Sequence, residues 1–98
     1  MSVTAYHFWS PTCAPCKALK PAVEDLKEEF TQVTWVSVNT HSDNEGVSKK
    51  YGVTVIPTIV VESKDAKGTV LSTEKHVGTA IAGYYRILRG GLKITQLS

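Results

Sequence analysis

The hydrophobic period of the chain changes once between residues 3 and 30, and no other feature constrains the fold as strongly. Residues 3–9 are rich in β-branched and aromatic types and place apolar side chains on both sides, which predicts a central β-strand. From about residue 13 to residue 30 apolar residues recur every three or four positions, which predicts an amphipathic helix. A Ser-Pro turn separates the two, and the only two cysteines, Cys13 and Cys16, lie at the start of the helix.

A second strand and a short helix are predicted next. Residues 33–39 alternate in polarity, as expected for a strand. Ser42 and Glu45 have the spacing of a capping box, and Gly52 is suited to end a helix. We therefore expect a helix over roughly residues 43–51.

The last third of the chain predicts a hairpin and a final helix. Residues 56–62 and 69–75 have the composition of strands, and the short polar link between them favours antiparallel pairing. A helix is expected over residues 79–89, where Gly90 and Gly91 would end it. Residues 92–98 are expected to form a loose tail.

The order of elements is β-α-β-α-β-β-α, which is an α/β fold. A βαβ unit normally joins parallel strands through a right-handed crossover, and the final hairpin adds antiparallel pairing. If the first strand pairs with the second and the third, the sheet is mixed, has the order 2-1-3-4 and carries helices on both faces. We expect one domain over residues 1–98, since this length supports a single core.

Composition excludes several classes of function. The formal net charge is +2 and the basic residues are spread out, so nothing favours nucleic-acid binding. No apolar run approaches the ~20 residues that span a bilayer, so we expect no membrane segment. Residues 1–5 have no basic segment followed by an apolar one, so no secretory signal is visible. We therefore expect a cytoplasmic, reducing setting, in which paired cysteines are usually catalytic or metal-binding.

The cysteine spacing favours dithiol chemistry. Two cysteines at i and i+3 lie on one side of a helix start, at a separation that permits a disulfide. The free N–H groups and partial positive charge of the helix N-terminus should lower the pKa of the Cys13 thiol below its free value of ~8.5, and Lys17 adds positive charge nearby. Cys13 is then the nucleophile and Cys16 the resolving thiol.

Zinc binding and an inert pair remain alternatives for these cysteines. A structural zinc site needs four ligands, and this chain has no further cysteine. His7, His41 and His76 could in principle complete the site, although they show no ligand spacing. We expect neither a metal nor another bound cofactor.

Three blocks of sequence resemble the thioredoxin family. Phe8-Trp9, Thr12–Lys17 and Pro21 are similar to its active-site segment, Lys50–Thr58 is similar to the segment that carries its cis-proline, and Val77-Gly78 is similar to the loop beside the site. The blocks occur in the family's order and cover most of the chain. The resemblance implies a thioredoxin fold in a short form, since only eight residues precede Trp9.

The resemblance also implies a substrate surface and partners. The Ile56–Pro57 bond would be cis, and the backbone of Ile56 would hydrogen-bond to an extended substrate segment. An apolar rim for docking would come from Ala14, Pro15, Val77 and Gly78, and Thr12 would also contact the substrate. The expected partners are proteins with disulfides and a thioredoxin reductase that uses a flavin and a nicotinamide, and the protein is expected to be a monomer.

This chain departs from the family at three positions of the site. Thr12 stands where the family commonly has Trp, and we expect it to be the N-cap of the helix. Ala14 replaces the common Gly. His7 replaces a buried Asp that helps to deprotonate the resolving thiol, and a histidine could do similar work near neutral pH. Alternatively, a charged His7 could stabilise thiolates, or a neutral His7 could have no catalytic part.

The predicted function is reduction of protein disulfides through the couple of Cys13 and Cys16. A glutaredoxin-type activity is the nearest alternative, but the residues that bind glutathione in that family are not found at the matching positions of this chain. A binding or adaptor module with a non-essential dithiol is the alternative from another class. Whether the protein works as a reductase, an oxidase or an isomerase depends on its reduction potential, which stays open here.

Overall fold

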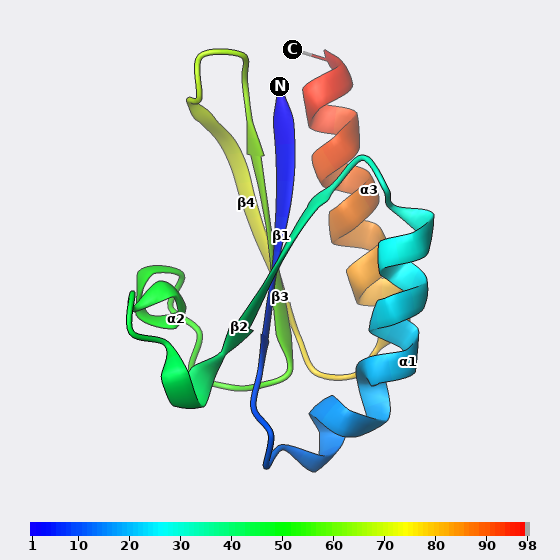
Figure 1. Ribbon diagram of the computed structural model, residues 1–98. Coiled ribbons are helices and arrows are strands. Elements are labelled where there is room, and N and C mark those ends of the chain that lie inside the picture. Colours follow the sequence, from blue (N-terminus) through cyan, green and yellow to red (C-terminus); the bar gives the residue numbers. More distant parts are fainter. Residues whose placement is uncertain (98) are drawn as a thin grey trace.

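Four strands form a single mixed sheet in the order β2-β1-β3-β4. The structure is a computed structural model, which describes residues 1–97 (Figure 1). Its elements are β1 (Ser2–Trp9), α1 (Ala14–Glu29), β2 (Thr34–Asn39), η1 (Thr40–Ser42), α2 (Val47–Lys50), β3 (Thr58–Lys64), β4 (Val70–Val77) and α3 (Ile81–Leu97). The predicted fold class and strand order are confirmed.

The first strand lies at the centre of the sheet. It pairs in parallel with β2, where Ala5 lies opposite Trp35, and antiparallel with β3, where Ala5 lies opposite Val61. The hairpin of β3 and β4 is antiparallel, as predicted. Because β1 is hydrogen-bonded on both edges, the turn that follows Trp9 starts from a fixed position.

Helices cover both faces of the sheet, but unequally. Figure 1 shows α1 and α3 together on one face and the short α2 on the other. The larger core lies under α1 and α3, and its fully buried members include Ala5, Val23, Leu26 and Leu88. A smaller core on the α2 face is built around Phe8, Val38 and Val60. The alternation of side chains along β1 supplies both cores.

The final helix is longer than predicted. It runs from Ile81 to Leu97, so it passes through Gly90 and Gly91 and includes most of the expected tail, while Ser98 lies outside the described residues. Gly91 is buried against β3, because a Cβ there would lie 2.8 Å from Cγ1 of Val61. The hydroxyl of Ser63 donates to the carbonyl of Gly91 over 3.1 Å. Packing of this turn against the sheet therefore outweighs the weak helix propensity of glycine.

The short helix α2 also differs from its prediction. The expected capping box of Ser42 and Glu45 does not form, since η1 ends at Ser42 and the helix begins only at Val47. The carboxylate of Asp43 instead accepts the N–H groups of Val47 (2.9 Å) and Ser48 (2.8 Å). The hydroxyl of Ser48 also donates to this carboxylate over 2.6 Å, and it is the largest cause that lowers the pKa of Asp43. The two N–H groups lower the pKa as well, because all three hydrogen bonds favour the charged carboxylate.

The predicted end of this helix at Gly52 is correct. Gly52 has φ +65°, in the left-handed region that glycine adopts without steric cost. Its N–H donates to Lys49, and the N–H of Val53 donates to Ser48, which is the Schellman pattern of a helix end.

The two strands of the hairpin begin later than predicted, at Thr58 and Val70. Residues 56 and 57 belong to a turn, because the hydroxyl of Thr58 donates to the carbonyl of Val55 over 2.6 Å. Within residues 1–97, none of the helices combines the length and the apolar composition that a bilayer-spanning segment needs.

Candidate active site

The cysteine pair lies where the central strand turns into helix α1. Ser10 is buried directly after β1, and its carbonyl accepts the N–H of Cys13 over 3.3 Å. Pro15 lies in the first turn of α1, where its missing N–H leaves no helical hydrogen bond unmade. The local sequence therefore brings the strand to a stop and starts a helix within four residues.

Cys13 and Cys16 form a disulfide with a Cα–Cα distance of 5.2 Å. Cys13 is half-buried, whereas the side chain of Cys16 is only 5% exposed. Cys13 rather than Thr12 is the N-cap of α1, since its Sγ accepts the N–H of Cys16 over 3.2 Å and Thr12 is exposed. A sulfur at the N-cap takes the place of the usual oxygen acceptor and so lies against the positive end of the helix.

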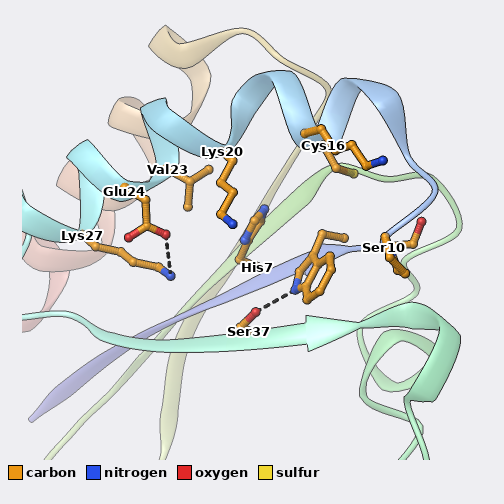
Figure 2. A pocket seen from close by; sticks show the side chains of 11 residues that line it. His7, Ser10, Cys16, Lys20, Val23, Glu24, Lys27 and Ser37 are labelled. Carbon is orange, nitrogen blue, oxygen red and sulfur yellow. Dashed lines mark hydrogen bonds and ion pairs between the residues drawn. The ribbon is translucent and has the colours of Figure 1, made fainter.

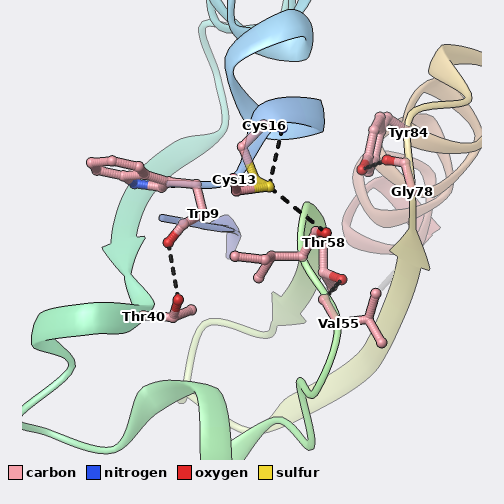
Figure 3. The surroundings of a disulfide bond; sticks show 9 residues. Trp9, Cys13, Cys16, Thr40, Val55, Thr58, Gly78 and Tyr84 are labelled. Carbon is pink, nitrogen blue, oxygen red and sulfur yellow. Dashed lines mark hydrogen bonds between the residues drawn. A yellow bond between two sulfur atoms is a disulfide. The ribbon is translucent and has the colours of Figure 1, made fainter. Parts of the chain in front are cut away.

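The peptide bond between Ile56 and Pro57 is cis. It lies in the segment between Val55 and Thr58, which Figure 3 shows beside the disulfide. Sγ of Cys13 lies 4.0 Å from the carbonyl oxygen of Ile56. Pro57 is buried, and its carbonyl accepts the N–H of Gly78 over 2.9 Å. Gly78 has φ +105°, which a residue with a side chain would rarely adopt, and its own carbonyl accepts the hydroxyl of Tyr84. These contacts join the two loops predicted to border the cysteines.

The rim of the site carries exposed apolar side chains. Ala14 and Pro15 are exposed on one side, and Val77 is 45% exposed on the other. Val55, which the sequence analysis did not select, is 56% exposed and precedes the cis bond. An apolar residue between the end of a helix and a proline is only a weak sequence signal for a binding surface. The start of a following strand accounts for the apolar residue equally well.

His7 lies beneath Cys16, on the face of β1 that α1 covers (Figure 2). It is 8% exposed, and its Nε2 is buried without a hydrogen-bond partner among the described residues. Burial and, to a smaller extent, the positive charge of Lys27 together lower the pKa of His7 to about 4, although the carboxylate of Glu24 partly opposes them. At pH 7 the ring is therefore neutral, which disfavours the alternative of a charged imidazolium beside the sulfurs.

A pocket of about 420 Å³ connects His7 with Cys16. Its walls come from β1, the following turn, α1 and β2, and the residues are His7, Trp9, Ser10, Pro11, Cys16, Lys17, Lys20, Val23, Glu24, Lys27 and Ser37. The four charged residues of α1 are spaced by three, four and three positions, so they share one flank of the helix. This spacing is visible in the sequence, but only the tertiary structure shows that these charged side chains lie near Cys16.

The three histidines lie far apart in the fold. His7 is under α1, His41 is exposed in η1, and the ring of His76 contacts Tyr84 edge to face at 4.9 Å between centroids. No group of three or more His, Cys, Asp or Glu side chains in the described part of the chain is arranged to hold a metal ion.

The fold and the site together define a class of protein, an α/β chain with a redox-competent cysteine pair at a helix N-terminus beside a cis-proline. The sequence model of the thioredoxin family matches residues 3–82. The chain belongs to the thioredoxin family.

Individual relatives match over a shorter length. Thioredoxin 1 of Synechococcus elongatus is 38% identical over 55 residues, which cover 55% of this chain and 50% of that protein. The chain thus spans about half the length of the curated relatives it matches.

Solved structures share the fold over most of the chain. Mitochondrial thioredoxin 3 of Saccharomyces cerevisiae, in its oxidised form, has a TM-score of 0.77 at 20% identity and covers 91% of this chain and 78% of its own. A chain in the structure of a complex between ferredoxin:thioredoxin reductase and thioredoxin f2 has a TM-score of 0.75 at 17% identity. The match covers 91% of this chain and 76% of that chain. At these identities the likeness concerns the fold alone.

Proposed function

We propose that this chain is a thioredoxin-type dithiol–disulfide oxidoreductase that reduces protein disulfides through Cys13 and Cys16. The observation that carries the proposal is the unequal placement of the two sulfurs at one helix start. Cys13 is only half-buried and its sulfur accepts an N–H group, whereas Cys16 is buried one turn further along. Such an arrangement separates a nucleophile from a resolving thiol.

The reaction has two exchange steps. The Cys13 thiolate attacks one sulfur of a substrate disulfide, which breaks the substrate S–S bond, forms a mixed disulfide and releases one substrate thiolate. Cys16 then loses its proton and attacks Sγ of Cys13, which releases the second substrate thiolate. The substrate gains two electrons and the chain is oxidised to the disulfide. Of the two protons on the substrate thiols, one is the proton that Cys16 loses and the other comes from solvent, because Cys13 reacts as the thiolate.

We propose that His7 takes up the proton that Cys16 loses. Both residues line one pocket, and the imidazole is neutral at pH 7 because its pKa is lowered to about 4. A pKa of about 4 makes the ring a weak base, but a thiolate forming nearby favours its protonated form. His7→Ala should therefore slow the resolving step, measured by stopped-flow exchange over pH 6–8. An unchanged resolving step over that range would remove His7 from the mechanism.

The substrate would bind as an extended segment beside the cis bond. The peptide backbone at Ile56 lies next to Cys13, where main-chain hydrogen bonds could align a substrate disulfide with Sγ. The exposed side chains of Ala14, Pro15 and Val77 offer apolar contact area around it.

The partners remain part of the proposal. They are proteins with accessible disulfides and a reductase that returns two electrons to the Cys13–Cys16 disulfide. The solved complex of ferredoxin:thioredoxin reductase with thioredoxin f2 contains a chain that shares the fold of this protein. This complex supports the proposal of a reductase partner for this chain. We also propose a cytoplasmic monomer.

Insulin reduction by dithiothreitol tests the activity. The wild-type chain should accelerate the precipitation of insulin chains, and Cys13→Ser should abolish the acceleration. Cys16→Ser should retain attack but stop at the mixed disulfide, which mass spectrometry detects as a covalent adduct. Turnover by Cys13→Ser at the wild-type rate would overturn the proposal, and a partner bound equally by the double Cys→Ser variant would favour an adaptor.

A further inference from the structure

Besides His7, the pocket behind the disulfide has polar groups that the proposed exchange reaction does not use. It encloses about 420 Å³, which lies within the range of ~300–1,000 Å³ typical of small-molecule sites. The proposed exchange would take place at Sγ of Cys13, which lies 4.0 Å from the carbonyl oxygen of Ile56. The pocket opens instead between α1 and β2, with Cys16 at one end (Figure 2).

The polar groups of this pocket are mainly hydrogen-bond donors. Lys17 and Lys20 form no ion pair with any residue from 1 to 97, whereas Lys27 lies 3.5 Å from the carboxylate of Glu24. The charge of the one acidic lining residue is thus balanced, and two positive charges are left over. A positive excess in a concave site attracts anions.

Ser37 adds a neutral donor on the opposite wall. Its Oγ accepts the indole N–H of Trp9 over 2.6 Å, and the hydroxyl hydrogen is then free to point at a ligand. The indole ring of Trp9 also lines the pocket and, together with Pro11 and Val23, supplies apolar wall.

His7 provides a second, independent observation that points to a ligand. Its side chain is more than nine-tenths buried, and Nε2 has no hydrogen-bond partner within the described residues. A buried polar atom without a partner costs about 1–3 kcal/mol, so such atoms are usually paired with protein, water or a ligand. The neutral ring can carry its proton on either nitrogen, so Nε2 can donate to a ligand and accept a proton when the pocket is empty.

From this convergence we propose that the pocket is a binding site for small aromatic carboxylates. The carboxylate would accept hydrogen bonds from Lys20, Ser37 and Nε2 of His7, and the ring would pack on the indole of Trp9. A bare inorganic anion would leave the apolar wall without a partner, and an uncharged aromatic molecule would leave the donors unsatisfied. The site thus requires both parts of the ligand.

The two tryptophans make a matched pair of reporters for a test with 2-naphthoate. The indole N–H of Trp9 lies in the pocket, whereas that of Trp35 donates to the carbonyl of Phe30 at the other end of α1. In ¹⁵N-labelled oxidised wild-type protein at pH 7, titration with 2-naphthoate should shift the Trp9 indole signal to saturation and leave the Trp35 signal in place. 2-Naphthylmethanol, which lacks the charge, should bind at least about fivefold more weakly.

Variants of two exposed lysines test the donor set. Lys20→Gln should weaken naphthoate binding about fivefold, while Lys49→Gln, in helix α2 on the other face of the sheet, should leave it unchanged. Both sites are exposed, so neither variant threatens folding. Bound naphthoate should also raise the midpoint at which the His7 ring signals titrate, because a nearby carboxylate favours the protonated ring.

Three results would overturn the proposal. They are a Trp9 signal that does not saturate up to the solubility limit of naphthoate, equal binding of the alcohol and the acid, and equal losses in the two lysine variants.

Discussion

Substituting His7 should change how the stability of the folded protein depends on pH. The folded-state pKa of His7 is about 4, below the ordinary histidine value of 6.5, because burial and Lys27 disfavour the charged ring. Between these two pH values the unfolded chain binds a proton that the folded chain does not, so the folded state loses stability as the pH falls. The contribution of His7 is therefore fully present above pH 6.5 and lost toward pH 4.

The magnitude follows from the size of the pKa change. Each pH unit over which the two states differ by one proton is worth about 1.4 kcal/mol, so the loss between pH 6.5 and pH 4 is about 3 kcal/mol. That is a large part of the 5–15 kcal/mol typical of a small domain. Because His7 is 8% exposed, solvent screening reduces this figure little.

Urea unfolding at a series of pH values from 4 to 7.5 measures this effect. His7→Gln removes the titrating ring. As the pH falls from 6.5 to 4, the free energy of unfolding of the variant should therefore decrease by about 3 kcal/mol less than that of the wild type. Carboxylates that titrate in the same range are common to both proteins and cancel in the comparison. His41→Gln, at an exposed position in η1, is the control and should keep the wild-type slope.

Equal slopes for His7→Gln and the wild type would refute the reasoning. A direct measurement guards against a variant that folds poorly. The ring proton signals of His7 in the wild-type protein should titrate with a midpoint near 4, and a midpoint near 6.5 would contradict the burial argument equally well.

Two further predictions concern packing, and thermal or urea unfolding measures both. Gly91→Ala should lower the free energy of unfolding by about 1–3 kcal/mol, because the new Cβ would lie 2.8 Å from Val61. Gly90→Ala should raise the free energy of unfolding by about 0.5–1 kcal/mol, because no atom lies within 4 Å of the new Cβ and alanine has the higher helix propensity. The reverse order would refute the packing of α3. Leu26→Ala should cost about 2–5 kcal/mol, and Leu71→Ala, 40% exposed, much less; similar losses would contradict the assigned core.

The architecture was predictable because strong local patterns agreed with one another. Apolar side chains on both sides of residues 3–9 predicted the central strand, and the three-to-four period that follows predicted the crossover helix. The cysteines and Pro57 then marked the two loops that meet at the site. Each of these signals depends on residues close in sequence, so no tertiary information was needed to interpret them.

The predictions from sequence were wrong where a contact outside the local sequence pattern determined the structure. Gly90-Gly91 is a common helix end, but the glycine at 91 is there because β3 approaches closely. Thr12 is a better N-cap residue than cysteine by propensity, yet the turn from Ser10 puts Cys13 at that position. The pocket behind Cys16 could not be predicted, because it forms between α1 and β2, which no sequence pattern places side by side in detail.

The central position of β1 has a consequence for the motions of the molecule. Amides hydrogen-bonded between two neighbouring strands usually exchange with solvent only when the whole domain unfolds, while edge strands and short helices open locally. His7 lies within β1, and Cys13 follows it by one tight turn. Hydrogen exchange should therefore find the sulfurs attached to the slowest-exchanging segment, so that local opening of β4 or α2 leaves the spacing of His7, Cys13 and Cys16 intact.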